Sequence, residues 1–407
     1  MLHLPLLRSI TTLLSLGLVV AGAYLVWSWR EGQWITDPTG DLLRVREDWR
    51  LWLGLVALGW SLAGRWLAPL LLARRDDEPT RPERTGGRMR ESATGSQLYV
   101  ETHGRAEAQP IILTHGWGMD STFWNYAKAD LSKRFRVIAW DLPGLGRSKA
   151  LAPQAITLSA FAGDLADLVD MCGHRRPVLV GHSIGGMIIQ TMLAERPEMR
   201  RRIAGVVLLN TTYTNPLKTM IFSRLMLALQ KPVLEPGARL TILLHPLAWL
   251  MQWQSYQSGL AHMAHRLGFG RYVTRSQLEH VTRLAARNPP AALARGTLAM
   301  FDWDATEAMK SVHVPTLVVA GELDIVTKLE ANARIADEAP AGTFEVVEGV
   351  NHLGPMERAD VYNRLIANFA LTLGAPAGGD RHAPRKPLEA EVVPFPGVAV
   401  TPTADPS

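Results

Sequence analysis

The sequence contains only one cysteine, Cys172, and this scarcity excludes a framework of disulfide bonds. Cys172 comes at the end of a predicted helix, where we expect a small buried side chain. The chain also lacks internal repeats and any basic patch with interleaved aromatic residues, so we expect no nucleic-acid partner. Its net charge of +5 comes largely from arginines near residues 74–90, which membrane topology explains better.

The spacing of histidines and carboxylates that is typical of a metal site is missing as well. His262 and His265 are close enough in the sequence to share one side of a helix, but no third ligand follows nearby. We therefore expect these two histidines to pack within a helical segment, and we expect no bound metal.

Two long apolar runs lie within residues 1–75, and each is long enough to cross a bilayer as a helix. The first covers residues 10–29 and the second covers residues 51–73. Tryptophans, whose indole rings favour the headgroup region, lie near the ends of both runs: Trp27, Trp29, Trp49, Trp52 and Trp66. These features predict a membrane anchor with two transmembrane helices, and therefore a membrane as a partner of this chain.

Both runs leave an alternative open. Arg65 interrupts the second run and would cost about 2.5–3.5 kcal/mol at the centre of a span, so an interfacial or re-entrant helix is the alternative there. Because Arg65 lies past the midpoint, its side chain can extend toward the interface, and the surrounding leucines favour a true span. Residues 1–23 are similar to a signal peptide, but the run stays apolar through Trp29, which favours an uncleaved helix.

The distribution of arginines predicts the orientation of this anchor. More arginines follow the second run than occupy the loop at residues 30–50. Because positively charged residues accumulate on the cytoplasmic side, we expect both termini there. The domain that follows the anchor would then lie on the cytoplasmic face of the membrane.

Apolar segments with strand and helix patterns alternate over residues 96–372, which is typical of a mainly parallel sheet covered by helices on both faces. Residues 76–95 are polar and predict a linker before this domain. Residues 373–407 are rich in proline, alanine and glycine, and they predict a disordered tail. The expected strands are residues 97–101, 111–114, 136–140, 177–181, 205–210, 315–320 and 343–347.

One apolar strand ends in Gly181-His182-Ser183-Ile184-Gly185, and a helical pattern follows at once. A G-x-S-x-G sequence between a strand and a helix is typical of a nucleophile elbow, so we expect Ser183 to be the nucleophile. Gly181 and Gly185 lack a Cβ atom, which lets strand and helix approach closely around the serine. The serine then lies at a helix N-terminus, where the helix dipole favours developing negative charge.

A serine hydroxyl needs a base that takes its proton and a carboxylate that orients this base. His352 follows the last predicted strand in a turn-rich loop and is the candidate base. Asp324 directly follows the preceding apolar strand and is the candidate carboxylate, with Glu322 as its nearest competitor. The chain order of serine, aspartate and histidine agrees with an elbow of this kind.

The sequence His115-Gly116-Trp117-Gly118 follows another apolar strand. Such a loop can direct a backbone N–H toward a developing oxyanion, together with the N–H of the residue after the nucleophile. We therefore assign the oxyanion hole to the amides of Trp117 and Ile184. His115 is a rival base, but we expect it to order the loop.

Five spaced motifs together resemble the α/β-hydrolase superfamily, in its Ser-His-Asp branch of esterases, lipases and C–C hydrolases. They are HGWG at 115–118, DLPGLGRS at 141–148, GHSIGG at 181–186, GELD at 321–324 and NHLGPMER at 351–358. The resemblance implies an α/β-hydrolase fold over residues 96–372 with a helical cap at about residues 212–312. It also implies a triad of Ser183, Asp324 and His352. It argues against dehalogenase or epoxide hydrolase activity, since those branches need an aspartate in place of Ser183.

These residues predict a serine hydrolase that cleaves a carboxylic ester with an apolar acyl or alcohol group, without any cofactor. The substrate would be an apolar small molecule or lipid that reaches the serine from the membrane or near it. A thioesterase, an acyltransferase or a C–C bond hydrolase would use the same triad. A catalytically inactive, membrane-anchored binding protein is the alternative from another class, and the complete triad disfavours it.

Overall fold

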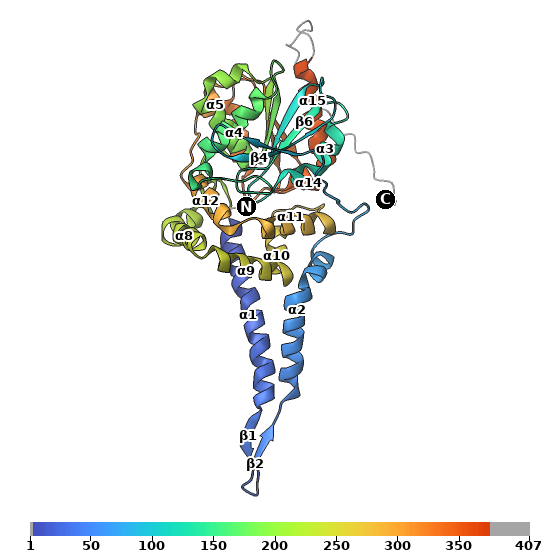
Figure 1. The fold of residues 1–407 in the computed structure, drawn as a ribbon, viewed down its shortest axis with the longest axis vertical. Coiled ribbons are helices and arrows are strands. Elements are labelled where there is room, and N and C mark those ends of the chain that lie inside the picture. The colour runs from blue at the N-terminus through green and yellow to red at the C-terminus, as the bar shows by residue number, and fades with distance from the viewer. Residues whose placement is uncertain (1–2, 375–407) are drawn as a thin grey trace, which may run out of the picture. The chain divides into compact units, whose positions relative to one another are not determined.

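An eight-stranded sheet forms the core of the large domain in the computed structural model, which describes residues 3–374 (Figure 1). Its strands are β3 (Arg88–Glu91), β4 (Gln97–His103), β5 (Pro110–Thr114), β6 (Arg136–Trp140), β7 (Val178–His182), β8 (Gly205–Leu209), β9 (Thr316–Gly321) and β10 (Gly342–Val347). The spatial order is β10-β9-β8-β7-β5-β6-β4-β3, and the strands from β10 to β6 are parallel. β4 runs antiparallel to β6 and to β3. The mainly parallel sheet predicted from the sequence is confirmed.

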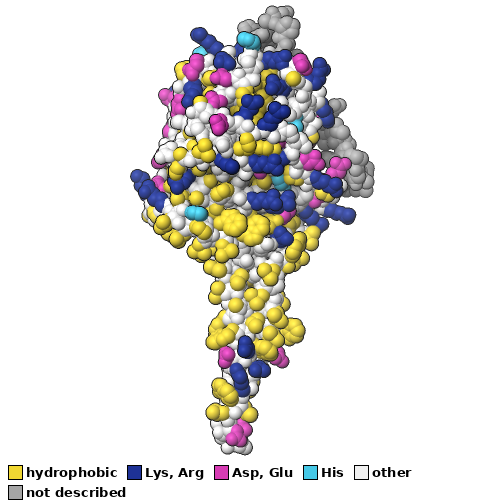
Figure 2. All heavy atoms as spheres, in the orientation of Figure 1, with side chains coloured by type: hydrophobic (Ala, Val, Ile, Leu, Met, Phe, Trp, Pro, Cys, Tyr) yellow, Lys and Arg dark blue, Asp and Glu magenta, His cyan; other side chains and the backbone are white. Residues whose placement is uncertain are grey.

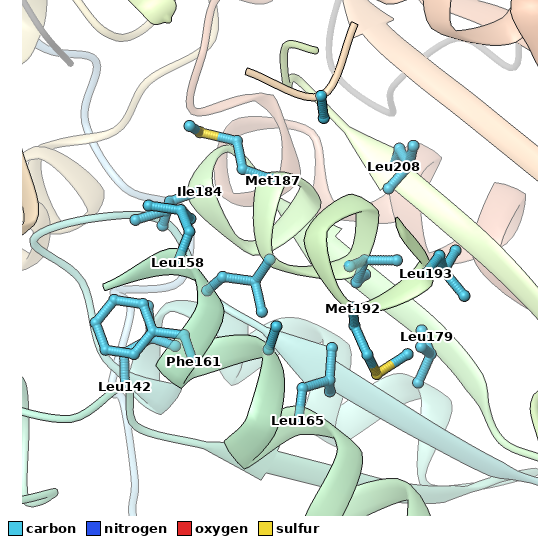
Figure 3. Packing of buried hydrophobic residues seen from close by; sticks show 14 of the residues in the cluster. Leu142, Leu158, Phe161, Leu165, Leu179, Ile184, Met187, Met192, Leu193 and Leu208 are labelled. Carbon is cyan, nitrogen blue, oxygen red and sulfur yellow. The ribbon is translucent and has the colours of Figure 1, made fainter. Parts of the chain in front are cut away.

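Helices cover both faces of this sheet. On one face α4 (Leu158–Asp170) and α5 (Ile184–Glu195) pack against strand residues such as Leu179 and Leu208, as Figure 3 shows. The other face is covered by α3 (Asn125–Leu131) and α15 (Ala359–Gly374). The central strands are continuously apolar because alternate residues point to opposite, buried faces. Five further elements accompany the sheet: η1 (Ser121–Trp124), η2 (Pro153–Ala155), η3 (Pro197–Arg201), α13 (Leu329–Glu338) and α14 (Gly354–Glu357).

The polar range 76–95, which the sequence predicts as a linker, contributes to the sheet. β3 lies inside this range and pairs with β4. Arg84 also forms ion pairs with Asp120 and Asp141, with 2.7 Å between the Arg84 nitrogen and the Asp141 oxygen. The four residues of β3 are exposed, and an exposed edge strand needs no apolar pattern. The domain built on this sheet therefore begins earlier than predicted. The predicted disordered tail lies almost wholly at 375–407, outside the described residues.

Two long apolar helices, α1 (His3–Glu31) and α2 (Asp48–Leu72), precede the sheet and lie side by side (Figure 1). A hairpin of β1 (Gln33–Thr36) and β2 (Leu42–Val45) connects them. Ile10–Glu31 and the whole of α2 are long and apolar enough to cross a membrane, by length and composition. These candidate spans contain nearly all of the two apolar runs seen in the sequence.

α1 and α2 approach closely where two glycines meet. A Cβ atom on Gly54 would lie 2.9 Å from the carbonyl oxygen of Gly22, so Gly54 has no room for a side chain, and one on Gly22 would be tightly packed, 3.1 Å from the carbonyl oxygen of Gly54. Large apolar side chains are exposed on both helices, among them Leu13, Val20, Val56, Leu62 and Leu71. Exposed apolar side chains along a helix of this length are typical of a surface that faces lipid.

A helical segment, here called the cap, lies between β8 and β9, in the range where the sequence predicts it. Its elements are α6 (Pro216–Thr219), α7 (Ser223–Leu229), η4 (Gln230–Leu234), α8 (Glu235–Leu243), α9 (His245–Gln257), α10 (Leu260–Arg266), α11 (Arg275–Arg287), α12 (Pro290–Phe301) and η5 (Ala308–Ser311). α11 begins with a capping box of Thr274 and Gln277, which satisfies backbone donors at the helix start.

Small and polar residues join the cap to the two candidate spans. The Ser15 Oγ atom of α1 lies 2.9 Å from the Ser258 Oγ atom, and the Gln254 side-chain amide donates to the Ser61 carbonyl at 3.1 Å. Gly64 of α2 lies against the backbone of Ser258, where a Cβ atom would collide. α9 and α10 therefore pack directly on the N-terminal helices.

Arg65, which interrupts the second apolar run, lies against aromatic rings. Its guanidinium carbon is 4.3 Å from the centroid of the Trp66 ring and 5.6 Å from that of Tyr256 in the cap. Cation–π contacts of this kind offset part of the cost of a charge in an apolar helix. The arginine is thus accommodated by the contact between α2 and the cap.

Candidate active site

Ser183 connects β7 to α5 in a strained backbone conformation. Its φ of 54° and ψ of −118° lie in a region that residues with a side chain rarely adopt. A Cβ atom at Gly181 would collide with Gly185, and one at Gly185 would collide with the carbonyl of Thr114. Glycine at both positions therefore permits the sharp strand-to-helix turn that presents the serine hydroxyl.

The structure brings together Ser183, Asp324 and His352, the predicted nucleophile, carboxylate and base. The Ser183 Oγ atom lies 2.9 Å from His352 Nε2, and His352 Nδ1 lies 3.0 Å from Asp324 Oδ2. The three residues follow β7, β9 and β10, whose carboxyl ends lie at the same edge of the sheet. His352 and Asp324 are buried, while Ser183 is half-buried. The serine proton thus has a direct path to an oriented imidazole.

Four hydrogen bonds hold the Asp324 carboxylate in addition to its contact with His352. The side chains of Asn210 and Thr327 donate to Oδ2 at 3.0 and 2.8 Å. The amides of Val326 and Thr327 donate to Oδ1 at 2.8 and 2.9 Å. Burial by itself raises the pKa of Asp324, but attraction to His352 and these hydrogen bonds together lower the pKa well below its ordinary value. Asp324 is therefore ionised at neutral pH.

Glu322, the nearest competitor of Asp324, binds a different part of the site. Its Oε2 atom accepts a hydrogen bond from the Gly349 amide at 2.7 Å. Asn351 adds a second link, because its Oδ1 atom accepts from the amide of Ile325 at 3.1 Å. These bonds join the loop that carries the carboxylate to the loop that carries the base.

The surroundings of His352 favour the neutral imidazole. Burial lowers the pKa of His352, and attraction to Asp324 opposes this shift only in part. A neutral imidazole with its Nδ1–H directed at Asp324 leaves Nε2 as an acceptor that faces the Ser183 hydroxyl. This is the protonation state that a general base requires before the reaction begins.

His182 is a site residue that the sequence argument passed over. Its Nε2–H donates to the backbone carbonyl of His352 at 2.8 Å, and its ring stacks on Phe123 with the centroids 4.7 Å apart. Complete burial lowers the pKa of His182 well below its ordinary value, so this ring stays neutral. The residue before the nucleophile thereby supports the loop of the base.

Asn210 and Tyr362 also support the carboxylate and were not predicted. The Tyr362 hydroxyl donates to Asn210 Oδ1 at 2.9 Å, and the Asn210 amide nitrogen in turn donates to Asp324. Asn210 adopts a φ of 47°, which asparagine tolerates better than most residues. The sequence feature that could have identified Asn210 as a site residue is its position directly after β8.

The loop with the sequence HGWG packs against the elbow. A Cβ atom at Gly116 would lie 3.5 Å from the Ser183 Cβ atom, so loop and nucleophile are in close contact. Ile184 is the first residue of α5, and its N–H has no partner within that helix. Trp117 follows Gly116 directly, so both residues to which the sequence assigns the oxyanion hole border the serine.

The side chains of His115 and Trp117 in this loop form hydrogen bonds that hold the loop in place. The buried His115 accepts from the Leu142 amide through Nε2 at 3.0 Å and donates through Nδ1 to the Gly116 carbonyl at 2.9 Å, so it orders the loop as expected. The Trp117 indole N–H donates to the carbonyl of Leu293 in α12 at 3.1 Å. The cap therefore rests on the predicted oxyanion loop.

The two cap histidines have partners of their own. His262 Nε2 lies 2.8 Å from Glu279 Oε2, and His265 Nδ1 donates to the carbonyl of Ala261 at 2.8 Å. Within residues 3–374, no group of three or more histidine, cysteine or acidic side chains is placed to hold a metal ion.

Comparison with known proteins agrees with this fold. The model of the alpha/beta hydrolase family matches residues 111–365. A protein named "Putative carbamate hydrolase RutD" from Caulobacter sp. is 26% identical over 282 residues, which cover 69% of this chain and 97% of that protein. A non-heme chloroperoxidase from Burkholderia pyrrocinia is 28% identical over 284 residues, with 67% and 95% covered. The solved esterase RhEst1 from Rhodococcus sp. superposes with a TM-score of 0.55 at 21% identity, covering 71% of this chain and all of its own.

Proposed function

Because the chain belongs to the alpha/beta hydrolase family, we propose that it is a serine hydrolase acting on a carboxylic ester with an apolar acyl or alcohol group. The observation that carries this proposal is the continuous hydrogen-bonded path from Ser183 through His352 to Asp324. The strained backbone conformation of Ser183 at the start of α5 also supports the proposal. An inactive binding protein would have no need to maintain this geometry.

In the proposed reaction Ser183 Oγ attacks the ester carbonyl while its proton moves to His352 Nε2. Ionised Asp324 holds the imidazole in the required tautomer and stabilises the imidazolium that forms. The amides of Trp117 and Ile184 donate to the oxyanion of the tetrahedral intermediate. His352 then protonates the departing alcohol, and the acyl group remains on Ser183 as an ester.

Water completes the proposed cycle. His352 takes a proton from a water molecule, whose oxygen attacks the acyl-enzyme carbonyl. The second tetrahedral intermediate then collapses to release the carboxylic acid, while His352 returns the proton to Ser183 Oγ. An alcohol or thiol in place of water would give acyl transfer by the same steps. The triad therefore supports acyl transfer through Ser183 as the reaction type, while the acceptor depends on what reaches the acyl-enzyme.

The proposal extends to the membrane. We propose that α1 and α2 cross the bilayer, with the hydrolase domain on the cytoplasmic side, because arginines are more frequent after α2 than in the loop between the helices. The exposed apolar side chains on both helices and the aromatic contacts of Arg65 support the two spans. A hydrolase held in this way meets apolar substrates where they accumulate.

A panel of p-nitrophenyl esters of graded acyl length tests the proposed activity, with acyl-CoA, alcohol acceptors and an aryl carbamate as further arms. We expect ester hydrolysis that increases with acyl length, and its loss in Ser183→Ala. Ser159→Ala, which removes an exposed hydroxyl, is the matched control and should behave as the unchanged protein. Turnover of thioesters or carbamates alone would contradict the assignment of an ester substrate but would leave the assignment of the triad unchanged.

A further inference from the structure

The cap presents an apolar outer surface next to the candidate spans. Several large apolar side chains are exposed there, with Leu243 at 75% and Phe222 at 73%, and α8 has no buried residue at all. We call this surface the apolar cap surface, and it consists of Phe222, Leu225, Leu240, Leu243, Leu247 and Leu250. Soluble proteins rarely leave apolar side chains gathered in this way on successive helices, so the surface requires an occupant.

The charge around this surface is positive. Residues 216–271 contain one acidic residue, Glu235, whose carboxylate accepts from the side chain of Gln230. Basic residues are far more numerous in the same range, and Arg224, Lys231 and Arg239 are exposed on α7, η4 and α8. Helices that combine exposed leucines with arginine and lysine are typical of proteins that lie in the interface of an anionic bilayer.

The depth at which the cap contacts the two candidate spans also indicates that a lipid bilayer covers this surface. Gly64 lies about eight residues before the end of α2, which corresponds to about 12 Å of helix, and it touches Ser258 of the cap. Ser15, inside the other candidate span, hydrogen-bonds to the same serine. If these helices cross a bilayer, the end of α9 that leads into Ser258 lies within its boundary. Figure 2 shows the hydrophobic side chains continuing from α1 and α2 onto the adjoining cap helices.

We propose that the apolar cap surface docks into the boundary between headgroups and acyl chains of an anionic leaflet. The proposal rests on the proposed spans and is independent of the chemistry of Ser183. The docked helices are connected to the site through α12, because α8 contacts α12 and Leu293 of α12 accepts the hydrogen bond of Trp117. An amphiphilic ester resident in the leaflet is therefore the substrate class to which this surface gives access.

Site-directed fluorescence quenching in the full chain tests the docking. Cys172→Ala provides a background without cysteine, into which Leu243→Cys is introduced and labelled with an environment-sensitive dye. The protein is reconstituted into vesicles of phosphatidylcholine and phosphatidylglycerol that contain lipids with a quencher near the headgroup or deep in the acyl chain. Leu13→Cys in α1 is the control within a span, and Leu371→Cys, an exposed leucine on α15, is the matched control on the hydrolase domain.

We expect quenching at Leu243 by the shallow quencher and no quenching at Leu371. A variant with Arg224→Gln, Lys231→Gln and Arg239→Gln should shift the docking equilibrium toward the undocked state by about fivefold for each charge removed. Far-UV circular dichroism of the same samples shows that each variant is folded, and fluorophosphonate labelling of Ser183 tests the proposed hydrolase separately.

Three other results would overturn the docking. Quenching at Leu13 without quenching at Leu243 would leave the anchor in place and refute the docked cap. Absence of quenching at both positions would refute the anchor and the docking together. Disulfide cross-linking of unlabelled Leu243→Cys between two copies, with protection of the labelled variant from lipid quenchers, would show that a second copy covers the surface.

Discussion

The Nε2 atom of His182 lies 2.8 Å from the backbone carbonyl oxygen of His352, so the residue before the nucleophile holds the loop of the base. Both residues are completely buried. A hydrogen bond of this kind helps to hold the His352 imidazole in position relative to Ser183. A displacement of about 1 Å between reacting groups lowers the reaction rate substantially.

His182→Phe retains the ring that stacks on Phe123 but removes the hydrogen bond to the His352 carbonyl. Because the carbonyl would then be buried without its donor, we expect a loss of about 1–3 kcal/mol in stability and roughly tenfold in kcat. His182→Gln can still donate and should recover most of the lost kcat, while KM changes little in both variants. Equal kcat values for the two variants would contradict a positioning role.

The pH dependence of kcat/KM should report the burial of His352. Burial lowers the pKa of this imidazole below its ordinary value of 6.5, and only the neutral form accepts the serine proton. Activity should therefore be constant above this lowered pKa and decrease as the pH falls through it. An acidic limb with its midpoint above 6.5 would contradict a buried general base.

Asp324→Asn should test the carboxylate. An amide in this position favours the wrong imidazole tautomer, so kcat should fall by about 10⁴-fold. Glu322→Gln is the matched control, since Glu322 contacts the Gly349 amide and not the imidazole, and its effect on kcat should be far smaller. If Glu322→Gln were the more damaging change, the assignment of the carboxylate would be wrong.

Arg65→Leu should separate membrane insertion from packing on the cap. Loss of the contacts with Trp66 and Tyr256 should lower stability in detergent by about 1 kcal/mol, as a decrease in Tm shows. Extraction from membranes should become no easier, because removal of a charge favours a span. The control is Arg75→Leu, an exposed residue beyond α2. An unchanged Tm for Arg65→Leu would show that the aromatic contacts contribute no stability.

Much of this fold and site follows from local sequence. The apolar strands lie within two residues of their predicted bounds, and Ser183, Asp324 and His352 each directly follow a strand or its turn. Contacts between distant segments leave no local pattern, which is why β3, His182 and Asn210 escaped prediction. The approach of Gly22 to Gly54 belongs to the same class, since it depends on how α1 and α2 face one another.

Identification of the residue that a fluorophosphonate modifies tests the central claim most directly. Digestion and mass spectrometry of the labelled, full-length protein should locate the adduct on the peptide that contains Ser183. Ser183→Ala should give no adduct, while Ser159→Ala should be labelled at the unchanged rate. Undiminished labelling of Ser183→Ala, or an adduct on another residue, would contradict the account of this protein as a serine hydrolase that uses Ser183.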